Sequence, residues 1–88
     1  MHDYREHTPQ TIFAKNLKMY LKQYIKGEVY CSIHNDTLSV NITCVNDIIF
    51  RYKLENLSSE IHNGLASEMV TQIIVKRYKR YIENLFFL

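Results

Sequence analysis

Hydrophobic residues near the N-terminus recur every three to four positions, the spacing that places side chains on one side of a helix. Thr8-Pro9 begins this segment, with threonine as the N-cap and proline at the first helical position, where it loses no hydrogen bond. We expect a helix over residues 9–26, ended by Gly27. Its apolar stripe consists of Ile12, Phe13, Leu17, Tyr20, Leu21, Tyr24 and Ile25.

A longer segment with the same period, residues 65–88, ends the chain. Ser67 is in position to cap this second helix. Glu68 falls in the first turn, where the helix dipole favours a negative charge. A helix of about six turns needs a wide apolar surface to pack against, and the middle of the chain offers one. The apolar positions are Met69, Val70, Ile73, Ile74, Tyr78, Tyr81, Ile82, Leu85 and Phe86.

Apolar and polar residues alternate strictly over residues 29–54, a pattern typical of half-buried strands. Two turns interrupt the alternation: Asn35-Asp36, whose residues both tolerate positive φ, and residues 45–47. With two- and three-residue turns, every inward-facing residue lies opposite another, whereas a slip by one residue would reverse every side chain. The pattern therefore predicts a three-stranded antiparallel meander. Its predicted pairs include His34 with Thr37, Ile33 with Leu38, Cys31 with Val40, Val29 with Ile42, Cys44 with Ile48, Ile42 with Phe50 and Val40 with Tyr52.

Residues 57–63 are expected to form a helix of one or two turns, capped by Ser58 or Ser59 and broken near Gly64. The expected fold class is α+β, with the order α-β-β-β-(short α)-α. An antiparallel sheet needs cover on one face only, so we place both main helices on the same face. The open face is expected to carry Tyr30, Ser32, His34, Thr37, Ser39, Asn41, Thr43, Ile49, Arg51 and Lys53.

The size of the chain, 88 residues, indicates one domain in which residues 1–7 fray. No apolar run approaches the roughly 18 residues of a membrane span, and the N-terminus lacks the apolar region of a signal peptide. We therefore expect a cytoplasmic protein. The strand register places Cys31 and Cys44 roughly 14 Å apart. A disulfide needs Cα atoms within about 7 Å, so both cysteines are expected to be free thiols.

Residues that could support catalysis or metal binding do not converge in this sequence. The glycines stand alone at Gly27 and Gly64, so neither belongs to a phosphate-binding loop. Cys31 and His34 have the spacing of half a metal site, but on a strand their side chains point to opposite faces. We therefore expect neither an enzyme nor a bound metal or cofactor.

Positive charge is concentrated on two helices, although the formal net charge is only +2. Such stripes can follow a phosphate backbone, and in the C-terminal helix cations alternate with tyrosines, as on many nucleic-acid-binding surfaces. They are equally typical of the solvated faces of amphipathic helices. The candidate nucleic-acid contacts are Lys15, Lys18, Lys22, Lys26, Lys76, Arg77, Lys79 and Arg80.

The last helical turns are apolar on every side. One side can pack on the sheet, and the remainder needs cover from a protein partner or from a second copy of the chain. The candidate interface residues are Tyr81, Leu85, Phe86, Phe87 and Leu88.

Two segments resemble small uncharacterised proteins that phages and prophages of Gram-positive bacteria encode. Residues 20–30 (YLKQYIKGEVY) are similar to their junction of first helix and strand. Residues 63–67 (NGLAS), with residues 78–82 (YKRYI) in the following helix, are similar to their C-terminal part. This resemblance implies an accessory protein that binds host or phage proteins, including inhibitors of host defence such as CRISPR effectors. In topology alone, the predicted order of elements also resembles the double-stranded RNA-binding domain.

The sequence thus favours a non-enzymatic, phage-type accessory protein of the host cytoplasm. It would bind a protein partner or form a homodimer, and an anti-CRISPR-like inhibitor is one form that this function could take. The alternative is a nucleic-acid-binding protein whose basic helix faces join into one continuous patch.

Overall fold

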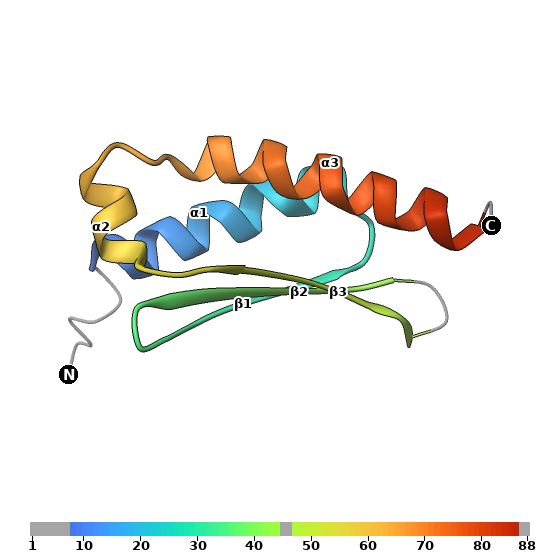
Figure 1. Cartoon of the computed structure of the whole chain (residues 1–88), viewed down its shortest axis with the longest axis horizontal. Helices are drawn as coiled ribbons and strands as arrows, with labels where there is room; N and C mark the ends of the chain where they lie inside the picture. Colours follow the sequence, from blue (N-terminus) through green and yellow to red (C-terminus); the bar gives the residue numbers. More distant parts are fainter. Residues whose placement is uncertain (1–7, 45–46, 87–88) are drawn as a thin grey trace.

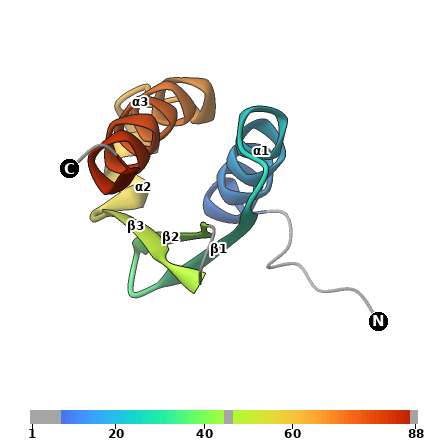
Figure 2. The ribbon, with the colours of Figure 1, turned by 90° about the vertical axis from the view of Figure 1, so that its right-hand side faces the viewer.

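Two long helices lie side by side on one face of a three-stranded antiparallel sheet (Figure 1). The computed structural model describes residues 8–44 and 47–86. Seen from the end, α1 lies over the β1 side of the sheet and α3 over the β3 side (Figure 2). The predicted fold class and element order are therefore confirmed. The elements are α1 (Pro9–Tyr24), β1 (Glu28–His34), β2 (Thr37–Thr43), β3 (Ile49–Leu54), α2 (Leu57–His62) and α3 (Ser67–Phe86).

The strand register agrees with the prediction. Cys31 pairs with Val40, and Ile42 lies between Val29 and Phe50 on the neighbouring strands. The first turn has φ values of 51° and 59° at Asn35 and Asp36, the left-handed conformation that a two-residue hairpin requires. In the second turn, which includes two residues outside the described part, the amide of Cys44 donates to the carbonyl of Ile48 (2.6 Å).

The core lies between the sheet and the two long helices. Leu38, Val40 and Ile42 on β2 have no solvent exposure, because β2 is the central strand and both helices cover its inner face. The outward positions of β1 and β3 are exposed, and those of β2 are half-buried between them, so the predicted open face is confirmed. The helices contribute the buried residues Phe13, Ala14, Leu17, Leu21, Val70, Thr71, Ile74 and Val75.

The end of α1 differs from the prediction. The helix stops at Tyr24, two residues early, and Ile25 is already extended with φ −123° and ψ 129°. Gly27 was expected to end the helix in a left-handed conformation, but Gly64 is the described glycine that has a positive φ. Gly27 is needed for a different reason. A Cβ atom there would lie closer than 3.0 Å to the carbonyl oxygen of Thr43 on β2, a separation that Cβ atoms essentially never show.

The start of α3 also differs from the prediction. Ser67 is the first helical residue rather than the N-cap, because the carbonyl of Ala66 accepts the amides of Met69 and Val70 (3.1 and 3.3 Å). The Ser67 side chain is buried, and its hydroxyl lies 3.5 Å from a carboxylate oxygen of Glu68. Glu68 does lie in the first turn, as predicted.

The short helix α2 is capped by a residue distant in sequence, and neither Ser58 nor Ser59 caps it. Asn56 occupies the N-cap position with a φ of 57° and makes no side-chain capping bond. Instead, the Asp36 carboxylate accepts hydrogen bonds from the amide and hydroxyl of Ser58 (3.0 and 2.7 Å). The Asp36 carbonyl also accepts the amide of Leu57 (2.9 Å). The β1–β2 turn thus supplies the acceptors that the first turn of α2 lacks.

Replacing Asp36 with alanine should lower the free energy of unfolding by about 2 kcal/mol. The lost cap accounts for about 1 kcal/mol and the strain of alanine at φ 59° for about another 1 kcal/mol. Asp36→Asn is the matched control, since asparagine tolerates this conformation and keeps one acceptor oxygen. Urea titration of both variants checks the prediction, which is wrong if the two variants lose equal stability.

Candidate protein interface

A groove of about 570 Å³ lies between the C-terminal ends of α1 and α3. The α1 side is formed by the last helical residue and the two residues that lead towards β1. The α3 side is formed by side chains from its last three turns. The lining residues are Tyr24, Ile25, Lys26, Val75, Tyr78, Lys79, Ile82, Glu83 and Phe86.

The groove exists because α3 is offset along α1 and extends well past its end. At 1.5 Å per residue, the 16 residues of α1 span about 24 Å and the 20 residues of α3 about 30 Å. The helices run in the same direction, and the Tyr20 hydroxyl near the end of α1 donates to the Glu68 carboxylate at the start of α3 (3.4 Å). Beyond Tyr24 the chain turns down to β1, so the last turns of α3 have no neighbouring helix (Figure 1).

Burial along α3 falls as α1 ends. Glu68, Val75, Ile82 and Phe86 are separated by seven, seven and four residues, so they lie on the side of α3 that faces α1. Val75 is 7% exposed, Ile82 is half-buried and Phe86 is 53% exposed. The apolar stripe therefore continues past the part of the protein that covers it.

Tyr78, one of the residues that line the groove, packs against an aromatic residue of β3. The ring centroids of Tyr78 and Phe50 on β3 are 5.7 Å apart, and the ring planes meet at 89°, an edge-to-face arrangement. Burial, together with the nearby Cys44 side chain, raises the pKa of the Tyr78 phenol above its ordinary value. The phenol is therefore neutral at physiological pH, so Tyr78 adds no charge to the groove.

Cations form most of the charged rim. Lys26 and Lys79 line the groove from opposite sides, and Glu83 is the one acidic side chain among the lining residues. Lys76 lies one turn before Lys79 and with it lines an adjoining hollow on α3. Within residues 8–44 and 47–86, no ion pair engages Lys26 or Lys79. The rim therefore offers positive charge to whatever occupies the groove.

The predicted interface residues fall into three groups. Tyr81 is half-buried, with its ring centroid 5.5 Å from that of Phe50, and packs against the edge of the core. Leu85 and Phe86 are 37% and 53% exposed at the end of α3. Phe87 and Leu88 lie outside the described residues.

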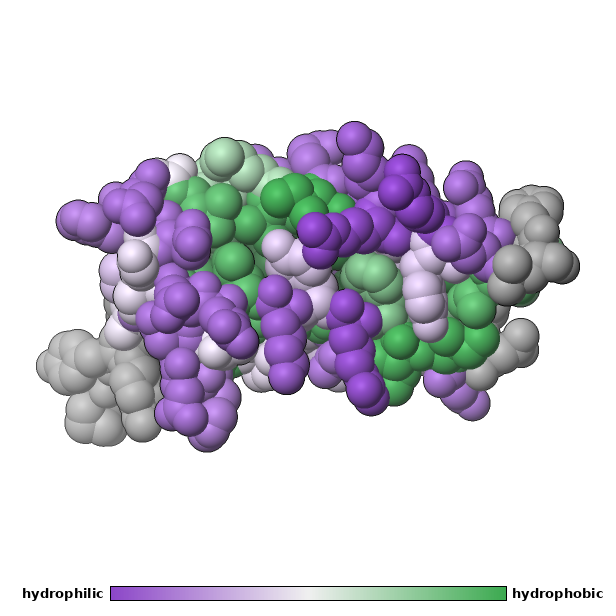
Figure 3. Space-filling model, in the orientation of Figure 1, coloured by the Kyte–Doolittle hydropathy of each residue, from purple (hydrophilic) through white to green (hydrophobic). Residues whose placement is uncertain are grey.

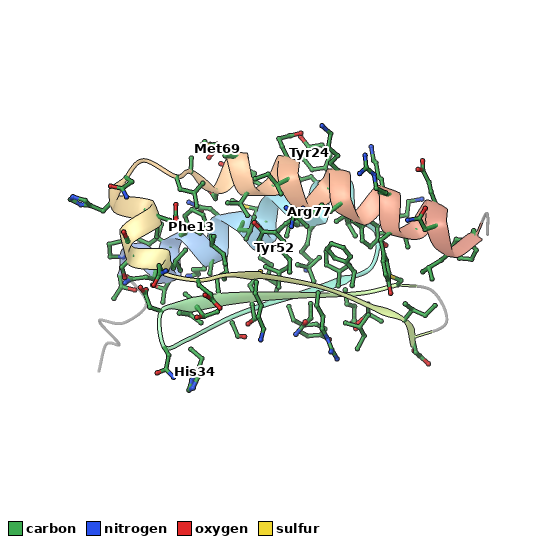
Figure 4. All side chains as sticks on the ribbon, in the orientation of Figure 1. Phe13, Tyr24, His34, Tyr52, Met69 and Arg77 are labelled. Atoms are coloured by element: carbon green, nitrogen blue, oxygen red, sulfur yellow. The ribbon has the colours of Figure 1, made fainter. Side chains whose placement is uncertain are left out.

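Sequence reasoning missed the α1 side of the groove. Tyr24, which is 56% exposed, was assigned to the buried stripe of a longer helix, but it projects from the helix layer where α1 stops (Figure 4). Ile25 was assigned to the same stripe and is buried in the groove wall. The early end of α1, which the apolar spacing did not reveal, is what opens this side.

The two basic stripes face different edges of the sheet. Lys18 lies near Cys31 on β1, where its charge lowers the pKa of the thiol, although burial dominates and raises that pKa to about 11. Arg77 instead lies over the Tyr52 ring on β3, 5.5 Å from its centroid (Figure 4). β1 and β3 are opposite edges of the sheet, and the groove is the place where both stripes contribute a lining residue, Lys26 from one and Lys79 from the other. The candidate contacts Lys15, Lys18, Lys22, Lys76, Arg77 and Arg80 are exposed or half-buried.

The remaining surfaces offer less to a ligand. On the side of α3 and β3, hydrophilic side chains break up the apolar surface (Figure 3). Met69 and Ile73 of α3 are exposed apolar residues outside the groove lining. His34 projects from the open face of the sheet, away from the helices (Figure 4). Cys31 packs against the core on the opposite face. Both thiols are free, as predicted. In the described part of the chain, no three His, Cys, Asp or Glu side chains gather as a metal site would require.

None of the helices in the described residues is both long enough and apolar enough to span a membrane. Among the described residues, the groove combines a largely apolar lining with a clear structural origin. No protein-family model, no curated protein and no solved structure matches this chain.

Proposed function

We propose that this protein is a non-enzymatic binding protein that holds a segment of another protein in the groove between the ends of α1 and α3. One observation carries the proposal: the apolar stripe of α3 runs past the end of α1, from buried Val75 to exposed Phe86. Covering that stripe would stabilise a complex by about 25 cal/mol per Å² of apolar surface removed from water.

The resemblance to phage-encoded proteins supports an accessory role in the cytoplasm of a bacterial host. The partner would then be a host or defence protein, and an inhibitor of the anti-CRISPR type is one form of this function. Such inhibition needs tight occupation of a partner surface and no chemistry from the inhibitor.

Site-specific photocrosslinking in extract of the cells that carry the gene tests the proposal. A benzophenone amino acid replaces Phe86 on the groove in one variant and Tyr30 on the open sheet face in another. The two positions are matched, since each native side chain is 53% exposed. We expect one discrete protein adduct from position 86 and none from position 30. Equal adducts from both positions, or none from position 86, would count against the groove.

Nucleic acid is the competing ligand. Phosphate contacts would make the affinity for DNA or RNA fall steeply with salt, and reversing Lys18 and Lys22 to glutamate would flatten that dependence. These lysines lie on α1, before the residues that line the groove. A salt-dependent affinity that these reversals remove would replace the proposed function with the nucleic-acid alternative.

A further inference from the structure

We infer that the occupant of the groove is an acidic amphipathic helix of another protein, which lies along the last turns of α3 where α1 would run if it were longer. This inference rests on the proposed function and names the chemistry of its partner. Shape and charge at the groove support it independently.

The shape of the site is that of a missing helix. The side of α3 that packs on α1 near Glu68 continues through Val75 and Ile82 to Phe86, at the three- to four-residue multiples that a neighbouring helix contacts. The α1 chain leaves this track at Tyr24, and its next two residues close the near end of the groove. A partner helix in line with α1 would contact the apolar side of α3 in its last turns, as α1 contacts α3 near Glu68.

The charge of the rim selects an acidic partner. Lys26 lines the groove from the α1 side and Lys79 from α3, and Lys76 lies one turn before Lys79. Glu83 alone opposes them within the lining. Acidic residues that flank the apolar stripe of a partner helix would pair with these lysines, speeding association and selecting the partner.

The same charges disfavour the other occupants. A second copy of the chain docked groove to groove would bring two mostly basic rims together, and like charges across an interface oppose binding. Nucleic acid would satisfy the lysines but leave Ile82 and Phe86 facing phosphates, which cannot cover apolar surface.

Three synthetic peptides of about 16 residues test the inference, a length at which helices become stable enough to compare. The first places leucine along one helical face with glutamate on both flanks. The second replaces each glutamate with lysine, and the third keeps glutamate but replaces leucine with alanine. Fluorescence anisotropy with the full-length protein should show the first peptide binding at least about tenfold more tightly than either of the others.

Variants of the protein locate the binding. Lys79→Glu should weaken binding of the acidic peptide about tenfold and strengthen binding of the basic one. Lys53→Glu on the exposed face of the sheet is the matched control for the same change in charge and should alter neither. Phe86→Ala should also weaken binding of the acidic peptide. The Phe86 side chain is exposed, so the fold does not depend on it.

Two results would overturn the inference, and each is distinguishable from failure of the proposed function. Equal affinity for the acidic and basic peptides, with a crosslinked partner still obtained from position 86, would leave a protein-binding groove whose occupant is not acidic. A concentration-dependent dimer in analytical ultracentrifugation that Lys79→Glu strengthens would make a second copy the occupant. Absence of both peptide binding and crosslinks would end both proposals.

Discussion

Replacing Gly27 with alanine is expected to lower the free energy of unfolding by about 3 kcal/mol, a large part of the stability of a domain this small. The added methyl group would collide with the carbonyl oxygen of Thr43, and the carbonyl carbon lies only 3.2 Å from the same point. Both atoms belong to the backbone of β2, where Thr43 pairs with Glu28 in the sheet. Neither strand can move away without breaking that pairing, so the clash cannot be relieved by a side-chain rotation.

Gly64→Ala is the control for this prediction. No atom lies within 4 Å of a Cβ built at Gly64, so alanine there meets no obstacle and pays only the strain of a φ of 99°. That strain costs about 1 kcal/mol. Chemical denaturation of both variants should therefore rank Gly27→Ala well below Gly64→Ala in stability. The reverse order would mean that backbone conformation, rather than close approach to β2, is what requires glycine at position 27.

Leu17→Ala is expected to destabilise the protein by about 3 kcal/mol, the usual cost of truncating a fully buried leucine. Leu17 has no solvent exposure and lies in α1 over the sheet, among the apolar residues of the core. Alanine also favours a helix, so the loss of stability measures the missing contacts and the new cavity rather than a change in helix propensity. Thermal or urea unfolding measures it directly.

The same substitution at Leu85 supplies the comparison. Leu85 also lies in a helix but is 37% exposed in the last turn of α3, so its truncation should cost less than about 1 kcal/mol. If Leu85→Ala cost as much as Leu17→Ala, and the loss depended on protein concentration, the end of α3 would be covered by a second copy in solution. That result would support the homodimer over a partner of different sequence.

The candidate site was predictable only in part. An apolar excess at the end of the chain pointed to Phe86 and Leu85, which are exposed. It also pointed to Tyr81, which is half-buried because its ring packs against Phe50 on β3. Whether an apolar residue in the last turns is buried depends on how far the neighbouring elements extend. Spacing along one helix carries no information about that length.

The sequence by itself determined the order of elements, the register of the sheet and the face that the helices cover. These follow from local periods of two and three to four residues, because a one-residue slip would expose every buried side chain of a strand. Only the tertiary structure decided where α1 ends, that Asp36 caps α2 and that Gly27 passes close to β2. Each of these depends on a contact between segments distant in the chain, where geometry outweighs local preference. The groove has the same origin, since it arises from the offset between two packed helices.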